Sequence, residues 1–225
     1  MTVDELWQTR AAAWELAALS LRYPGAELAG AAAGGEWNEA AGEILAALGL
    51  SAEVPAAAGE GGCEAAAGAD ALLHALRPEA TRLFVGAPGP ACSPYEGVWA
   101  AEADGVQPLL FVNPRSMEVE RFMRSCGLGR PEGTNEPLDH VATECELLEH
   151  LALRAAGAPA SEGAPDGAGL PGGSPAAAYE AFLSGYAQAW MPAFAERLAA
   201  EARHPFYRAA AAYLGALLAD WPSEA

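Results

Sequence analysis

Helix-favouring sequence runs through almost all of this 225-residue chain, and little in it favours a β-strand. Alanine is the dominant residue while Val and Ile are scarce, so helix propensity is high nearly everywhere. Helix start signals recur along the chain, as a capping box of Thr2 and Glu5 and as caps or first residues at Asn113, Pro175 and Pro205. The only strand candidate is the short run "QPLLFVNP" at residues 107–114. We therefore predict an all-α fold, a single globular domain over residues 1–225 with about nine or ten helices.

Composition and proline positions predict where helices break. Residues 157–174 are a flexible low-complexity linker of Gly, Ala and Pro, and residues 51–69 are a weaker loop. We expect Pro192 to break the helix that Pro175 opens, and Pro137 to start a long helix that ends near Ala155. In "SPYE", at residues 93–96, we expect Ser93 to cap a helix that begins at Pro94, with a capping box completed by Glu96.

The charge of the chain excludes several kinds of protein. The formal net charge is −18, and every one of the twelve basic residues is Arg. A phosphate-binding loop, a Schiff-base site and a protein-kinase site all need a Lys, so none of them is possible here. Nucleic acid and anionic lipid both need clusters of basic residues, so we expect no nucleic-acid partner. The charge favours a basic partner instead.

We expect the protein to be cytoplasmic, without stable membrane insertion. No apolar run approaches the roughly 18 residues of a membrane span, and the acidic start "MTVDELWQTR" is not a secretory signal. The four cysteines are widely separated, which indicates reduced thiols.

The densest group of titratable residues lies in "GTNEPLDHVATECELLEH", at residues 133–150. Glu136, His140 and Glu144 are spaced by four, which stacks side chains on one face of a helix. Two alternatives are a carboxylate–histidine metal site and a small enzyme that uses the 136–150 cluster for acid–base chemistry. A metal site lacks matching ligands elsewhere in the sequence, and an enzyme lacks a recognisable nucleophile or cofactor motif. We therefore expect no cofactor.

Spacing alone favours a solvated, well-capped helix face over either of these sites. Under that interpretation Asp139 lies in the first helical turn, where its charge suits the helix dipole. The buried stripe of the same helix consists of Leu138, Val141, Cys145, Leu148 and Ala152. A fourth possibility is a surface that grips arginine side chains, because clustered carboxylates bind guanidinium groups bidentately.

Two blocks of the sequence resemble a known family. "EPLDHVATECELLEHL" at residues 136–151 resembles the E-P-x-D-H signature of the TorD/DmsD/NarJ family of redox-enzyme maturation chaperones. "EATRLFVGAPGPACSPYEGVW" at residues 79–99 resembles that family's second block, in which R-L-F is followed by S-P-Y-E. "FLSGYAQAWMPAFAERL" and "HPFYRAAAAYLGALL" resemble its C-terminal helices. The resemblance departs from the family pattern after Glu144, where Leu-x-Phe-Met is usual and Cys145 to Leu148 stand instead.

The resemblance implies an all-α chaperone without catalytic activity. Its client would be the catalytic subunit of a molybdopterin oxidoreductase, bound through a basic twin-arginine leader so that cofactor insertion precedes export. The chain would act as a monomer or homodimer. The residues that match the two motifs, and that we expect at the client site with Trp99 beside them, are Glu136, Pro137, Asp139, His140, Glu144, Ser93, Pro94, Tyr95 and Glu96.

Overall fold

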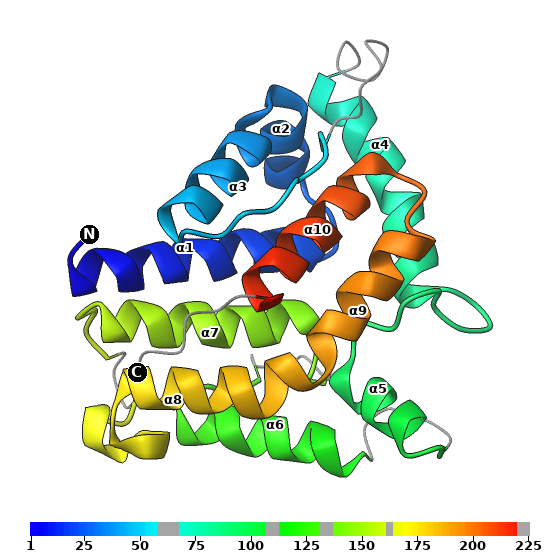
Figure 1. Ribbon diagram of the computed structural model, residues 1–225. Coiled ribbons are helices and arrows are strands. Elements are labelled where there is room, and N and C mark those ends of the chain that lie inside the picture. Colours follow the sequence, from blue (N-terminus) through cyan, green and yellow to red (C-terminus); the bar gives the residue numbers. More distant parts are fainter. Residues whose placement is uncertain (58–67, 107–112, 131–136, 161–163, 220–225) are drawn as a thin grey trace. The chain divides into compact units, whose positions relative to one another are not determined.

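The computed structural model describes residues 1–57, 68–106, 113–130, 137–160 and 164–219. Within these ranges the chain is helical and contains no strand, which confirms the predicted all-α class. The helices are α1 (Val3–Leu21), α2 (Ala26–Gly34), α3 (Glu36–Ala47), α4 (Gly68–Ala80), α5 (Glu96–Ala103), α6 (Pro114–Ser125), α7 (Val141–Ala155), α8 (Pro175–Phe182), α9 (Gln188–Glu201) and α10 (Pro205–Ala219) (Figure 1). Most of the strand candidate at 107–114 lies outside the described residues.

The chain forms two compact units. The first consists of residues 1–18 and 95–190, and the second of residues 19–94 and 191–225, so the division falls within α1 and within α9. One domain over residues 1–225 stays a prediction.

Aromatic side chains form the core of the first unit. α7 packs along α8, and α5 packs against α6 (Figure 1). Trp14 is fully buried and its indole Nε1 donates to the Tyr179 hydroxyl at 2.6 Å, while Trp7 meets the same tyrosine ring edge-on at 5.2 Å between ring centroids. The stripe predicted on α7 is buried, with Leu138 8% exposed and Val141, Cys145, Leu148 and Ala152 fully covered. Helix propensity thus gives the local form, and this apolar stripe determines which face is buried.

The second unit has its own aromatic core, around Trp37 and Phe84. The Trp37 Nε1 donates to the Ser20 hydroxyl at 2.9 Å, and its ring lies 5.5 Å from Phe206. Phe84, in the family's R-L-F element, contacts Tyr207 at 5.5 Å between ring centroids. Its neighbour Arg82 donates two hydrogen bonds of 2.9 Å to the carboxylate of Glu79.

Several predicted helix ends are confirmed. Thr2 and Glu5 form the expected capping box, with Thr2 N donating to Glu5 Oε2 at 2.6 Å and Glu5 N donating to Thr2 Oγ1 at 3.2 Å. Asn113 caps α6 by accepting from Arg115 N at 2.8 Å. α8 and α10 begin at Pro175 and Pro205, and α7 ends at Ala155, all as predicted.

The prediction for Pro192 is wrong. α9 continues through Pro192 to Glu201, and the irregular segment lies upstream, as a π-helical turn at Leu183–Ala187 between α8 and α9. Pro78 likewise stands inside α4, which is followed by a second π-helical turn, Thr81–Val85. A proline removes one backbone donor, and in α4 and α9 the helix continues through it.

The predicted linker contains turns that sequence analysis did not anticipate. Outside 161–163 it includes two 3-10 turns, Gly167–Gly169 and Pro171–Gly173, with Leu170 only 4% exposed between them. Asp166 caps the first turn by accepting from Gly169 N at 2.9 Å. Flexibility of residues 157–174 stays a prediction. Most of the predicted loop at 51–69 lies outside the described residues.

Candidate functional site

The helix that follows the E-P-x-D-H signature begins at Val141 and not at Pro137. His140 is its N-cap, because the imidazole Nδ1 accepts a hydrogen bond of 3.1 Å from the backbone N–H of Ala142. His140 therefore stands before the helix, and the predicted stack of Glu136, His140 and Glu144 on one helical face is wrong. Glu136 itself lies outside the described residues. Pro137 is buried.

Asp139 caps a different helix from the one we predicted. Its carboxylate Oδ2 accepts from the backbone N–H of Gly97, in the first turn of α5, at 2.9 Å. Its backbone carbonyl accepts from Glu96 N at 3.0 Å. α5 begins at Glu96 after Tyr95, so the cap predicted at Ser93 is wrong. The carboxylate and the backbone carbonyl of Asp139, from a distant segment, accept from the first two backbone donors of the helix instead.

Close packing around this cap explains why residue 97 is a glycine. A Cβ atom on Gly97 would lie 2.3 Å from the Ser116 hydroxyl oxygen and 3.1 Å from Asp139 Oδ2. The Ser116 hydroxyl itself donates to Asp139 Oδ2 at 2.6 Å. The Asn113 amide donates to the Gly97 carbonyl at 2.8 Å. Residues from α5, α6 and the start of α7 therefore meet at one point.

The two motif segments also pair directly. Tyr95 and His140 form an isolated antiparallel bridge, and their rings meet edge-on with centroids 5.3 Å apart. Both side chains are half-buried. Burial lowers the pKa of His140 to about 4, so the imidazole is neutral near pH 7, as its role as a hydrogen-bond acceptor requires. We call this place, where residues 95–99 meet residues 137–144, the motif junction.

Three carboxyl groups are buried at the motif junction. Glu96 and Asp139 are 1% exposed, and Glu144 is fully covered. Arg115 Nε donates to Glu96 Oε1 at 2.5 Å, and the indole Nε1 of Trp190 donates to Glu144 Oε2 at 3.1 Å. The interpretation of Glu144 as part of a solvated helix face is therefore wrong, whereas Glu146 and Glu149 on the same helix are half-buried.

Glu96 and Glu144 interact with each other. Burial and the neighbouring Glu96 raise the pKa of Glu144 well above its ordinary value. Burial also raises the pKa of Glu96 to about 6, although Arg115 acts to lower it. Two of the buried carboxyl oxygens, Glu96 Oε2 and Glu144 Oε1, accept no hydrogen bond from any N–H or hydroxyl group of the described residues. A proton held between the two carboxyl groups gives each of these oxygens a partner.

Arg115 connects this cluster to the π-helical turn before α9. One of its terminal nitrogens donates to the carbonyl of Gly185, and its guanidinium lies over the Tyr186 ring, 4.3 Å from the centroid. Sequence analysis missed Arg115, Ser116 and Trp190. The Asn113–Pro114 cap predicts that Arg115 and Ser116 begin a helix, but no local signal identifies partners 19 or more residues away in the chain.

The remaining predicted residues are divided between the two units. Trp99 is half-buried in the first unit, where its ring centroid lies 6.4 Å from that of Trp190. Ser93 and Pro94 belong to the second unit, in which Ser93 is half-buried and Pro94 is buried.

At the motif junction, buried carboxyl groups hold the backbone that carries the exposed side chains. Its carboxyl groups outnumber its one guanidinium, and they are occupied in capping and pairing. In the described ranges, no group of three or more His, Cys, Asp or Glu side chains is arranged to hold a metal ion. What the junction offers a partner is the exposed part of Tyr95, His140 and Trp99.

These features define an all-helical protein in which two sequence motifs, far apart in the chain, build one junction. The model of the nitrate reductase delta subunit family matches residues 34–196, and the chain belongs to this family. This confirms the family of redox-enzyme maturation chaperones that the two motifs indicated. No curated protein matches the chain.

Membership of the family gives the general role. The family consists of molybdoenzyme maturation chaperones and not of catalytic enzymes, and its partner is a nitrate reductase-like molybdoenzyme subunit. Within the described residues, no helix is long and apolar enough to cross a membrane.

Proposed function

We propose that this chaperone acts in the cytoplasm and binds the basic N-terminal leader of the catalytic subunit of a molybdopterin oxidoreductase. Where the leader carries twin arginines, binding it delays export until the cofactor is inserted. The observation that carries the proposal is the motif junction, where the half-exposed rings of Tyr95 and His140 adjoin three buried carboxyl groups in a chain of net charge −18. A leader with arginines next to an apolar stretch is complementary to such a surface.

The proposal assigns different roles to the predicted site residues. Tyr95, His140 and Trp99 contact the leader, because part of each ring reaches the surface. Glu96, Asp139 and Glu144 hold that surface in shape, since their side chains are buried and hydrogen-bonded, and the net charge of −18 attracts the basic leader. Ser93, Pro94 and Glu136 flank the junction in sequence and Pro137 is its first residue, and we propose that they belong to the client site as well.

The test is titration calorimetry with a synthetic leader from an oxidoreductase encoded beside this protein. We expect binding with Kd on the order of micromolar or tighter, weakened by added salt because charge contributes to it. The informative variant is His140→Asn, because Asn keeps an N-cap for α7 and removes the ring that meets Tyr95. It should unfold like the wild type and bind the leader about tenfold more weakly.

A matched control replaces an aromatic side chain away from the motif junction. Tyr23 is 59% exposed, and Tyr23→Ala should leave leader binding unchanged. Absence of heat with the leader, together with no client co-purifying from the native host, would rule out the proposal. Normal binding by His140→Asn would instead show that the motif junction does not contact the leader.

A further inference from the structure

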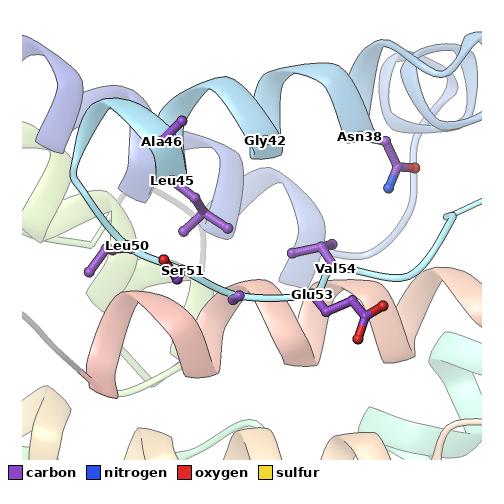
Figure 2. A pocket seen from close by; sticks show the side chains of 9 residues that line it. Asn38, Gly42, Leu45, Ala46, Leu50, Ser51, Glu53 and Val54 are labelled. Carbon is purple, nitrogen blue, oxygen red and sulfur yellow. The ribbon is translucent and has the colours of Figure 1, made fainter.

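The second unit contains a groove that lies outside both family motifs. It runs between one face of α3 and the segment 50–54 that follows this helix, and its volume is about 680 Å³ (Figure 2). Leu45 and Leu50 are among the residues that line it, and they are 3% and 9% exposed. Gly42 and Ala46 form the wall on α3, and both are exposed.

The wall on α3 is open at Gly42, which has no side chain. A Cβ atom added to Gly42 would meet no atom within 4 Å, so the space above this residue is empty. Glycine is unfavourable inside a helix because it gains no side-chain contacts and loses much backbone entropy on folding. Here the missing side chain leaves open space above Gly42 on the exposed face of α3.

The opposite wall offers free peptide groups. The side chain of Asn38 ties the segment to α3 by donating to the Pro55 carbonyl at 2.9 Å and accepting from Ala57 N at 2.8 Å. At the other end Leu50 N donates to the Leu45 carbonyl at 2.8 Å. Between these ties, the backbone of Ser51 to Val54 makes no hydrogen bond within the part of the chain that the structure describes. An extended peptide could therefore pair with it main chain to main chain.

The charge around the groove selects its partner. Residues 23–76 contain eight Asp and Glu residues and no Arg or Lys. Glu39 and Glu43 on α3 and Glu53 in the groove wall are exposed. This charge repels nucleic acid and anionic lipid. It also repels a second copy of a chain whose net charge is −18.

We propose that this groove binds the basic leader of the client as an extended peptide. The backbone of Ser51 to Val54 hydrogen-bonds the peptide, an apolar side chain lies over Gly42 and Leu45, and Glu39, Glu43 and Glu53 attract its arginines. The inference rests on the proposed function and adds a second contact surface to it, in a different unit from the motif junction.

The test is fluorescence anisotropy of the full-length chain with a fluorescein-labelled leader from the neighbouring oxidoreductase. Gly42→Leu fills the groove and raises helix propensity, so it should fold normally, as circular dichroism will check. We expect it to weaken leader binding about tenfold or more. The control is Gly30→Leu in α2, where a Cβ atom also meets nothing within 4 Å, and it should bind within about twofold of the wild type.

The charge requirement is tested separately. A leader with its arginines replaced by glutamine should bind the wild type more weakly, and the triple variant Glu39→Gln, Glu43→Gln and Glu53→Gln should bind the original leader with a smaller dependence on salt. If Gly42→Leu binds like the wild type, or if the triple variant keeps the full salt dependence, the groove is not a leader site and the proposed function stands. If the wild type binds no leader at all, the proposed function itself fails.

Discussion

Asp139 has a structural role that its place in the family signature does not reveal. Its carboxylate caps α5 and accepts from Ser116, and it is 1% exposed. A substitution that weakens client binding at this position can therefore act through the fold of the motif junction. Stability must be measured beside binding before Asp139 is counted as a client contact.

We expect Asp139→Ala to lower the free energy of unfolding by about 2–3 kcal/mol, because it removes two hydrogen bonds to a buried carboxylate and leaves Gly97 N without a partner. Ser116→Ala removes one of these bonds and should cost about 1 kcal/mol. Urea unfolding at pH 7 measures both. Asp166→Ala, at an exposed cap, is the control and should cost less than about 1 kcal/mol. Wild-type stability of Asp139→Ala would contradict the capping role.

Glu144 and Glu96 make stability depend on pH. Both have folded-state pKa values raised above the ordinary value of 4.5, Glu96 to about 6 and Glu144 well above it. A raised pKa means that the folded state holds the proton more tightly than the unfolded state. Their contribution is therefore complete below pH 4.5 and is lost as the pH rises through 6 and beyond.

Glu144→Gln should remove most of this loss. The Gln oxygen can accept from Trp190 Nε1 and its amide can donate to Glu96, as a protonated Glu144 would. We expect the variant to be on the order of 1–2 kcal/mol more stable than the wild type at pH 8 and about equal to it at pH 5. Urea unfolding at the two pH values measures the difference, with exposed Glu15→Gln as control. A variant less stable than the wild type at pH 8 would show that Glu144 is ionised in the folded protein.

At the scale of elements, the sequence predicted what local contacts determine. The capping box at Thr2, the Asn113–Pro114 start of α6 and the stripe on α7 depend on residues close in the chain, and all are confirmed. The prediction failed at Ser93 and at Pro137, because there the caps come from other residues: Asp139 serves α5, and His140 serves α7. Local pattern cannot show that a carboxylate 42 residues away satisfies a helix end. α2 was missed because "AELAGAAAG" is uniformly small and has no periodic pattern.

The contact between α5 and α6 depends on the pair of Arg115 and Glu96. Arg115→Met leaves Glu96 buried without its cation and should cost about 3 kcal/mol near pH 8. Adding Glu96→Gln to Arg115→Met should recover about 2 kcal/mol, since no buried charge then remains uncompensated. Arg124→Met breaks an exposed ion pair with Glu120 on the same helix and should cost less than about 0.5 kcal/mol. Urea unfolding of the four proteins measures the coupling, and additive costs of the two substitutions would contradict it.

At the scale of the whole molecule, composition and two motifs were enough for the class and the family. Alanine-rich sequence and the absence of strand patterns gave the all-α fold, and the order of the two blocks gave the maturation chaperones. The division into two units and the groove beside α3 could not be predicted, because both depend on how distant segments pack. The acidic stretch at 23–76 was visible in the sequence. Only the structure shows that an open face at Gly42, where a peptide could bind, lies within this acidic stretch.

The cap that Asp139 supplies also constrains the order in which the protein forms during synthesis. α5 is eight residues long, too short to be stable alone, and the carboxylate that completes its first turn is translated 42 residues after Gly97. A ribosome-bound chain that stops short of residue 139 therefore carries an "SPYE" segment that has not yet formed its helix. The motif junction therefore depends on both segments, and its first helix gains its cap only after residue 139 has been added.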